Sequence, residues 1–159
     1  MATEVDHTSK YKLASRWSRF WAGVIDFIVF ITFIIPIFFY TDVGERMTSS
    51  GQVSPMETAL FVVYSWLTYL LCNGYLLHKK GQTIGKNVFE IAIVDLDERL
   101  LGLPKLLVKR SLPMVILGYI PFIGSFMSLI NILFIFRKDK RCLHDLIAGT
   151  KVIDVTATK

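Results

Sequence analysis

One carboxylate lies inside an otherwise apolar stretch of the sequence. Asp26 is the single charged residue in the 21 residues from Phe20 to Tyr40. An ionised carboxylate is costly to bury, so it must be paired, neutralised or hydrated. Acids in such positions often mark ion or proton paths, but a carboxylate also clamps helices through hydrogen bonds. The sequence leaves both roles open for Asp26.

Four more residues of this kind flank the apolar stretches: Arg19, Arg110, His144 and Asp145. Arg19 precedes Asp26 by seven residues and so lies on nearly the same face of a helix, about 10 Å away. Histidine is the side chain best suited to titrate near neutral pH. We expect Arg19, Arg110, His144 and Asp145 to meet at one side of the membrane. With Asp26 they form the candidate polar cluster, for transport or for structure.

Other kinds of site find little support in the sequence. The histidines (His7, His78, His144) and the two cysteines lack metal-ligand spacing, and no nucleophile has a base and an orienting group. We therefore expect no metal, no cofactor and no enzymatic activity. Residues 81–87 resemble a phosphate loop, but the glycine spacing is one residue short and no Ser or Thr follows Lys86. A turn leading into a strand is the better interpretation.

Three long apolar stretches must position these residues. They are Phe20–Tyr40, Ala59–Leu77 and Leu112–Phe136, in a chain of 159 residues that is 53% hydrophobic. About 18 apolar residues suffice to span a bilayer core of about 30 Å. The pattern excludes a soluble domain, a disordered chain and a disulfide scaffold. It predicts an all-α membrane protein, a bundle of few transmembrane helices with a small cytoplasmic β element.

The distribution of basic residues predicts the topology. Residues 1–19 hold four Lys and Arg, residues 41–58 hold one, residues 78–111 hold seven and residues 137–159 hold six. Short loops rich in Lys and Arg remain in the cytoplasm. Both termini are therefore expected in the cytoplasm of a cell, with residues 41–58 outside. Anionic lipid accounts for these basic residues, so nucleic acid is not an expected partner.

The third apolar stretch is broken near its middle. Gly118, Pro121 and Gly124 interrupt it, and Pro removes a helical hydrogen bond. A pair of short helices that returns to the cytoplasm would keep the six basic residues that follow on the cytoplasmic side. The alternative is one long kinked helix that ends outside. The predicted spans are about 17–40, 59–77, 104–119 and 121–136, within a single domain over residues 1–159.

The cytoplasmic segment 78–103 and the tail 137–159 carry their own structural signals. Residues 88–94 and 151–156 are rich in β-branched and apolar residues, and we expect them to pair in a small sheet. Residues 141–148 form an amphipathic helix candidate that Gly149 ends. The sheet would lie at the cytoplasmic surface.

The chain resembles the RDD family of small integral membrane proteins. Three motifs carry the resemblance in order, at residues 14–26, 81–86 and 141–150. The Arg and the two Asp that name the family match Arg19, Asp26 and Asp145. Asn87 and Phe89 depart from the pattern, where a basic or small residue is common. The resemblance implies a fold of few helices in a cell membrane, with proposals of cation/proton exchange for some members.

Two functions follow as hypotheses. The first is a small transporter or cation/proton exchanger of the bacterial inner membrane, with Asp26 as carrier, Arg19 tuning its pKa, and a homodimer completing the site. The second is a membrane scaffold or regulatory subunit that binds a partner protein, with the Arg and Asp residues holding the fold. The sequence does not identify a substrate.

Overall fold

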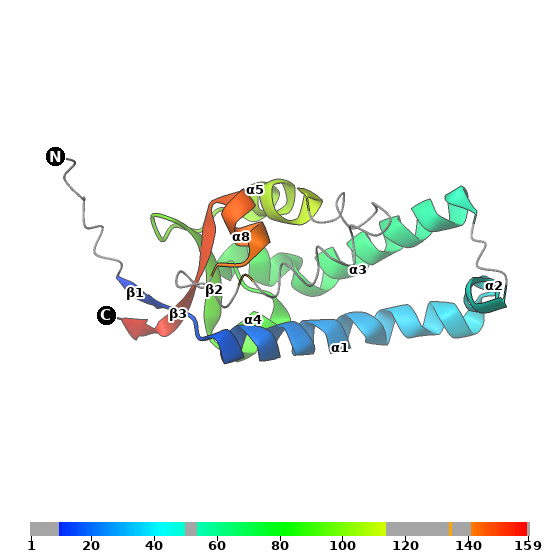
Figure 1. Ribbon diagram of the computed structural model, residues 1–159, viewed down its shortest axis with the longest axis horizontal. Helices are drawn as coiled ribbons and strands as arrows, with labels where there is room; N and C mark the ends of the chain where they lie inside the picture. The colour runs from blue at the N-terminus through cyan, green and yellow to red at the C-terminus, as the bar shows by residue number, and fades with distance from the viewer. Residues whose placement is uncertain (1–9, 50–53, 114–133, 135–140, 159) are drawn as a thin grey trace.

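The computed structural model describes residues 10–49, 54–113, 134 and 141–158. Two long helices, α1 (Arg16–Tyr40) and α3 (Pro55–Lys80), lie side by side and run in opposite directions (Figure 1). The short helix α2 (Val43–Ser49) lies at the end where they are joined. The sheet and the other short helices gather at the opposite end. All five predicted site residues lie at or near that end, since even Asp26 accepts hydrogen bonds from Thr83 and Gly85 there.

Local signals set the ends of α1. Ser15 is the N-cap, and its hydroxyl accepts a hydrogen bond from Ser18 N at 2.9 Å. The helix ends at Tyr40, before the extended residue Thr41. Its 25 residues rise about 37 Å. The predicted span 17–40 therefore agrees with α1.

Helix α3 is longer than the apolar run that predicted it. Ser54 and Glu57 form a reciprocal capping box, and Pro55 opens the helix. Gly81 closes it with φ +64°, and a side chain there would lie 2.5 Å from Ile93 O. These polar caps extend the helix beyond the predicted 59–77 at both ends. Part of the predicted outer loop is helical, since α2 lies within residues 41–58. Arg46 of α2 forms an ion pair with Glu57 of α3.

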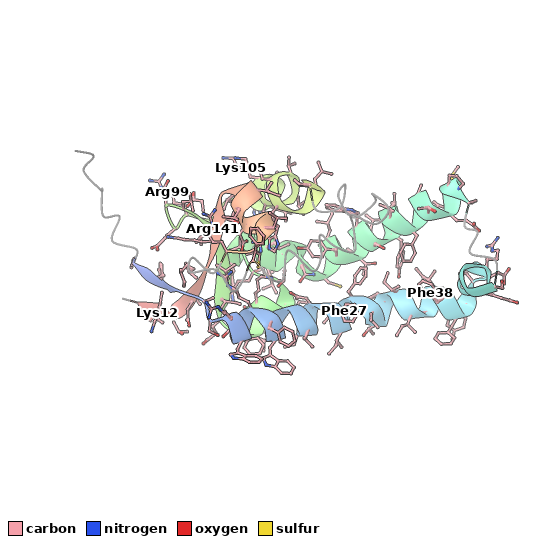
Figure 2. The ribbon with its side chains drawn as sticks, viewed as in Figure 1. Lys12, Phe27, Phe38, Arg99, Lys105 and Arg141 are labelled. Carbon is pink, nitrogen blue, oxygen red and sulfur yellow. The ribbon has the colours of Figure 1, made fainter. Side chains whose placement is uncertain are left out.

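Both long helices are long and apolar enough to cross a membrane. Only 11% of the most apolar part of α1 and 17% of that of α3 is buried. The core helix of a soluble protein would be mostly buried, so these faces suit contact with lipid. Large apolar side chains are exposed along both helices, including Phe39 and Leu71. Figure 2 shows Phe27 and Phe38 on α1.

A three-stranded antiparallel sheet closes one end of the molecule. Its order is β1 (Tyr11–Leu13), β3 (Thr150–Thr158) and β2 (Ile91–Asp95). Ile91 pairs with Asp154 and Asp95 with Thr150. The predicted pairing of residues 88–94 with residues 151–156 is present, while β1 was not predicted. The second strand begins at Ile91 and not at residue 88, because a short helix precedes it.

That short helix, α4 (Ile84–Val88), replaces the predicted turn. Thr83 is its N-cap, and Glu90 at φ 52° separates it from β2. Apolar residues of five elements then pack together beneath the sheet; the buried members are Ala14, Ala22, Leu77, Ile91, Ile93, Leu106 and Val152. This core fixes the sheet against the ends of α1 and α3.

The third apolar stretch is entered through α5 (Leu103–Leu106), which continues as the π-helix η1 (Leu107–Ser111). Helix α5 begins at Leu103, one residue before the predicted start at about residue 104, and Pro104 is its second residue. Most of the predicted spans 104–119 and 121–136 lies outside the described residues, and so does the choice between a hairpin and one crossing. In the tail, α8 (Leu143–Ala148) occupies the predicted helix and ends at Gly149.

Candidate functional site

Asp145 is placed by the first turn of α8. Its Oδ2 accepts a hydrogen bond from Cys142 N at 3.2 Å, which caps the helix. Thr150, where β3 begins, donates its hydroxyl to Oδ1 at 3.3 Å. Arg141 holds the same junction, since its Nη2 donates to the Asp145 carbonyl at 3.2 Å. The Asp145 side chain is completely buried.

Two guanidinium groups neutralise this buried carboxylate. Arg110 of η1 places Nη2 3.0 Å from Oδ1, and Arg19 of α1 places Nη1 3.5 Å from Oδ2. Arg19 also donates from Nη2 to Val152 O in β3 at 2.9 Å. The contacts connect α1, η1, α8 and β3. Removing one partner from such a buried group leaves an uncompensated charge and costs about 3–5 kcal/mol.

His144 belongs to this cluster as a neutral acceptor. Its Nε2 lies 2.6 Å from Arg110 Nη2, and a guanidinium can only donate. Burial, together with the charge of Arg110, lowers the pKa of His144 to about 3. The 3.5 Å approach of Nε2 to Asp145 is therefore not an ion pair at neutral pH. His144 fixes the orientation of Arg110.

The charges also decide the ionisation of Asp145. Burial alone would raise the pKa of Asp145, but Arg110, with Arg19 behind it, holds that pKa below its ordinary value. Since His144 is neutral, the two arginines supply this effect. Asp145 is thus ionised at neutral pH, and its carboxylate is sealed from solvent.

A metal ion does not suit this cluster. Ligand atoms of Cys142, His144 and Asp145 lie within 4.8 Å of one another. However, Arg19 and Arg110 already bind the carboxylate, and a divalent cation would add to two positive charges. Burial and the nearby Asp145 raise the pKa of Cys142, which disfavours the thiolate that binds metals.

Asp26 lies in a second, separate group. Its Oδ2 accepts from the Thr83 hydroxyl at 2.6 Å, and its Oδ1 accepts from Gly85 N at 2.8 Å. The cation beside it is Lys86, with Nζ 3.7 Å from Oδ2. In the part of the chain that is described, no hydrogen bond or ion pair joins Asp26 to Asp145. The structure therefore divides the five predicted residues between two clusters.

The short helix α4 holds this second group in place. Its first three N–H groups each have a side-chain acceptor: Ile84 N donates to Asn73 Oδ1 at 2.9 Å, Gly85 N to Asp26, and Lys86 N to Thr83. The first N–H groups of a helix have no acceptor within the helix, so these side chains satisfy them. Asp26 on α1 and Asn73 on α3 thus fasten α4 between the two long helices.

Close contact between α4 and α1 requires glycine at position 85. A Cβ on Gly85 would lie 2.0 Å from the carbonyl oxygen of Ala22. The predicted turn at residues 81–87 is therefore a packing motif: Gly81 ends α3, Thr83 caps α4 and Gly85 allows the approach to Asp26. Lys86 and Thr83 were not predicted as site residues. The contact of Lys86 with Asp26 depends on the packing of α4 against α1, which no local sequence pattern indicates.

A cavity of about 220 Å³ adjoins Asp26 between α1 and α3. Its polar lining comes from Asp26, Thr68 and Asn73; Phe27, Val29, Phe30, Tyr69 and Cys72 supply the rest. The Asp26 and Lys86 side chains are 21% and 17% exposed, against 0% for Asp145. The carboxylate of the second group therefore borders a cavity, whereas that of the first is sealed from solvent.

Comparison with known proteins supports one family. The model of the RDD family matches residues 13–149, which contain both clusters. The protein YckC of Bacillus subtilis, described as uncharacterized, is 32% identical over 148 residues, covering 92% of this chain and 87% of its own length. No solved structure matches the chain.

Proposed function

This chain belongs to the RDD family, and from that premise we propose that it exchanges a small cation for a proton across a cell membrane. Family membership and the apolar helices α1 and α3 make it a membrane protein. The proposal adds that it crosses the membrane several times, with both termini in the cytoplasm, and that it catalyses no covalent reaction. A second copy of the chain is the expected partner.

The observation that carries the proposal is the cavity at Asp26. A carboxylate offers about four lone-pair positions. Thr83 and Gly85 each use one, which leaves capacity for one cation. Lys86 Nζ lies 3.7 Å from Asp26 Oδ2. The cavity between α1 and α3 opens onto the same carboxylate. A ligand cation and the Lys86 ammonium would compete for the same anion.

This competition links cation binding to a proton. Burial, with a further contribution from Arg110, lowers the pKa of Lys86, so its proton is held less firmly than in water. When a cation occupies Asp26, Lys86 loses its counter-charge and releases H⁺. One positive charge replaces another, and the exchange is electrically neutral. Lys86 takes the role that the sequence had given to Arg19, whose guanidinium binds Asp145 instead.

The second candidate is a membrane scaffold or regulatory subunit that binds a partner protein. The hydrogen bonds from Thr83 and Gly85 favour it, because they give Asp26 a structural task in capping α4. The sealed Asp145 cluster holds the fold under either function. At Asp26 the two candidates differ in one respect: the exchanger needs the negative charge of Asp26 to bind a cation, whereas the scaffold needs only its hydrogen bonds.

Ion flux in proteoliposomes separates the candidates. The purified chain is reconstituted with a pH-sensitive dye inside, and gradients of Na⁺, K⁺ and methylammonium are applied. Exchange predicts cation-driven proton movement that Asp26→Asn abolishes, while its melting temperature stays near that of the parent. Asn keeps the size and the acceptor for Gly85 N but cannot ionise. The control is Asp42→Asn, the same change at an exposed site. A folded Asp26→Asn protein that still exchanges ions rejects the proposal.

A further inference from the structure

From the cavity beside Asp26 we infer the class of cation: a small organic ammonium ion with an apolar body of alkyl or arylalkyl type. The inference rests on the proposed exchange at Asp26, but binding alone can test it. The cavity would hold one such ion, whose charged end meets Asp26 and whose apolar part lies between α1 and α3.

The arrangement of the lining favours such a ligand. The anion lies at the wall where α4 is fastened, because Thr83 and Gly85 of that segment bind it. The other lining residues are mostly aromatic or aliphatic and include Phe30 and Cys72. A monocation with an apolar tail would satisfy both regions at once. Figure 2 shows Phe27, another lining residue, midway along α1.

A bare metal ion fits the same cavity poorly. Hard cations such as Ca²⁺ and Mg²⁺ take about six or more oxygen ligands. Both Asp26 oxygens already accept hydrogen bonds. The Asn73 oxygen accepts from Ile84 N, and its nitrogen donates to Tyr69 O. Too few oxygens remain to replace a hydration shell, whereas an ammonium needs only the carboxylate.

The cavity volume limits the size of the ligand. A dry cavity of about 150 Å³ holds benzene. A cavity of about 220 Å³ is half as large again. It should hold about nine non-hydrogen atoms, on the same scale. Hexylammonium, with seven, and phenethylammonium, with nine, both fit this limit.

The test is calorimetric titration of the full-length protein in detergent with ethyl-, butyl- and hexylammonium and with NaCl. Affinity is expected to rise about four-fold per added methylene, the value for burying a CH₂ group. Cys72→Phe fills the cavity without touching the Asp26–Lys86 pair, and it should abolish hexylammonium binding. The matched control is Leu71→Phe, one residue along α3, where the side chain is 85% exposed; it should bind as the parent does. Val29→Phe fills the cavity from α1 and repeats the test on the opposite wall.

The outcomes also separate this inference from the exchange. Affinity that does not depend on chain length, or hexylammonium binding that survives both cavity-filling changes, overturns the organic cation. If Na⁺ drives proton movement and no ammonium binds, the exchange stands and the ligand class is wrong. If hexylammonium binds and is lost in Cys72→Phe without any flux, the ligand site stands and the exchange is wrong.

Discussion

Replacing Gly85 with alanine tests how α4 is held against α1. The new Cβ would lie 2.0 Å from Ala22 O, and real Cβ atoms essentially never approach closer than 3.0 Å. The two backbones must therefore separate by about 1 Å. If that movement is along the hydrogen bond from Gly85 N to Asp26 Oδ1, it lengthens the bond from 2.8 Å to about 3.8 Å and breaks it.

The expected cost combines overpacking with a lost hydrogen bond. Overpacking costs about 1–3 kcal/mol, and a hydrogen bond to a charged group contributes about 1.5–3 kcal/mol. Gly85→Ala should therefore destabilise the protein by roughly 2.5–6 kcal/mol in the free energy of unfolding. Thermal unfolding in detergent, followed by circular dichroism, measures the change.

Two other glycines provide matched controls. In the described part of the chain, a Cβ added to Gly23 of α1 or to Gly74 of α3 would meet nothing within 4 Å beyond its own stretch of helix. Both are inside helices, so alanine there should stabilise by roughly 0.5–1 kcal/mol. A Gly85→Ala protein that is as stable as Gly23→Ala and Gly74→Ala would show that α4 does not need glycine at this contact with α1.

Three further predictions concern the sealed cluster and the topology. Asp145→Asn should cost about 3–5 kcal/mol of stability, because Arg110 and Arg19 lose their counter-charge. A melting temperature equal to that of the exposed control Asp97→Asn would contradict this. The pKa of His144 is about 3 in the folded protein and 6.5 in the unfolded chain, so stability should fall by up to about 1.4 kcal/mol per pH unit as the pH drops below 6.5. His144→Gln should reduce this pH dependence, which is measured as melting temperature against pH. In a cysteine-free background, Ala157→Cys should resist an impermeant reagent on intact cells, and labelling would place the C-terminus outside.

The parts of the fold that depend on long sequence patterns could be predicted. Helices α1 and α3 follow from apolar runs of bilayer length, and the pairing of β2 with β3 follows from two β-prone segments that were predicted to lie on the same side of the membrane. Residue type also identified Arg19, Arg110 and His144 as partners for Asp145. A charged side chain near a membrane has few possible partners, so residues of opposite charge there are expected to pair.

The remaining features depend on packing that no local pattern encodes. A five-residue helix such as α4 is too short for a periodic signal, and β1 has only three residues. Arg19 is seven residues from Asp26 but 126 residues from Asp145 in the sequence, and only the tertiary position of α8 directs it to Asp145. Lys86 was missed for the same reason. Its proximity to Asp26 appears only when α4 packs on Ala22.

Proton release measures whether a cation and the Lys86 ammonium compete for Asp26. Na⁺ and hexylammonium are each titrated into the purified protein in two buffers that differ in ionisation enthalpy. Competition predicts up to one proton released per cation bound by the parent protein, and binding without proton release by Lys86→Gln. Cation binding to the parent without proton release, or equal release from Lys86→Gln, would contradict it.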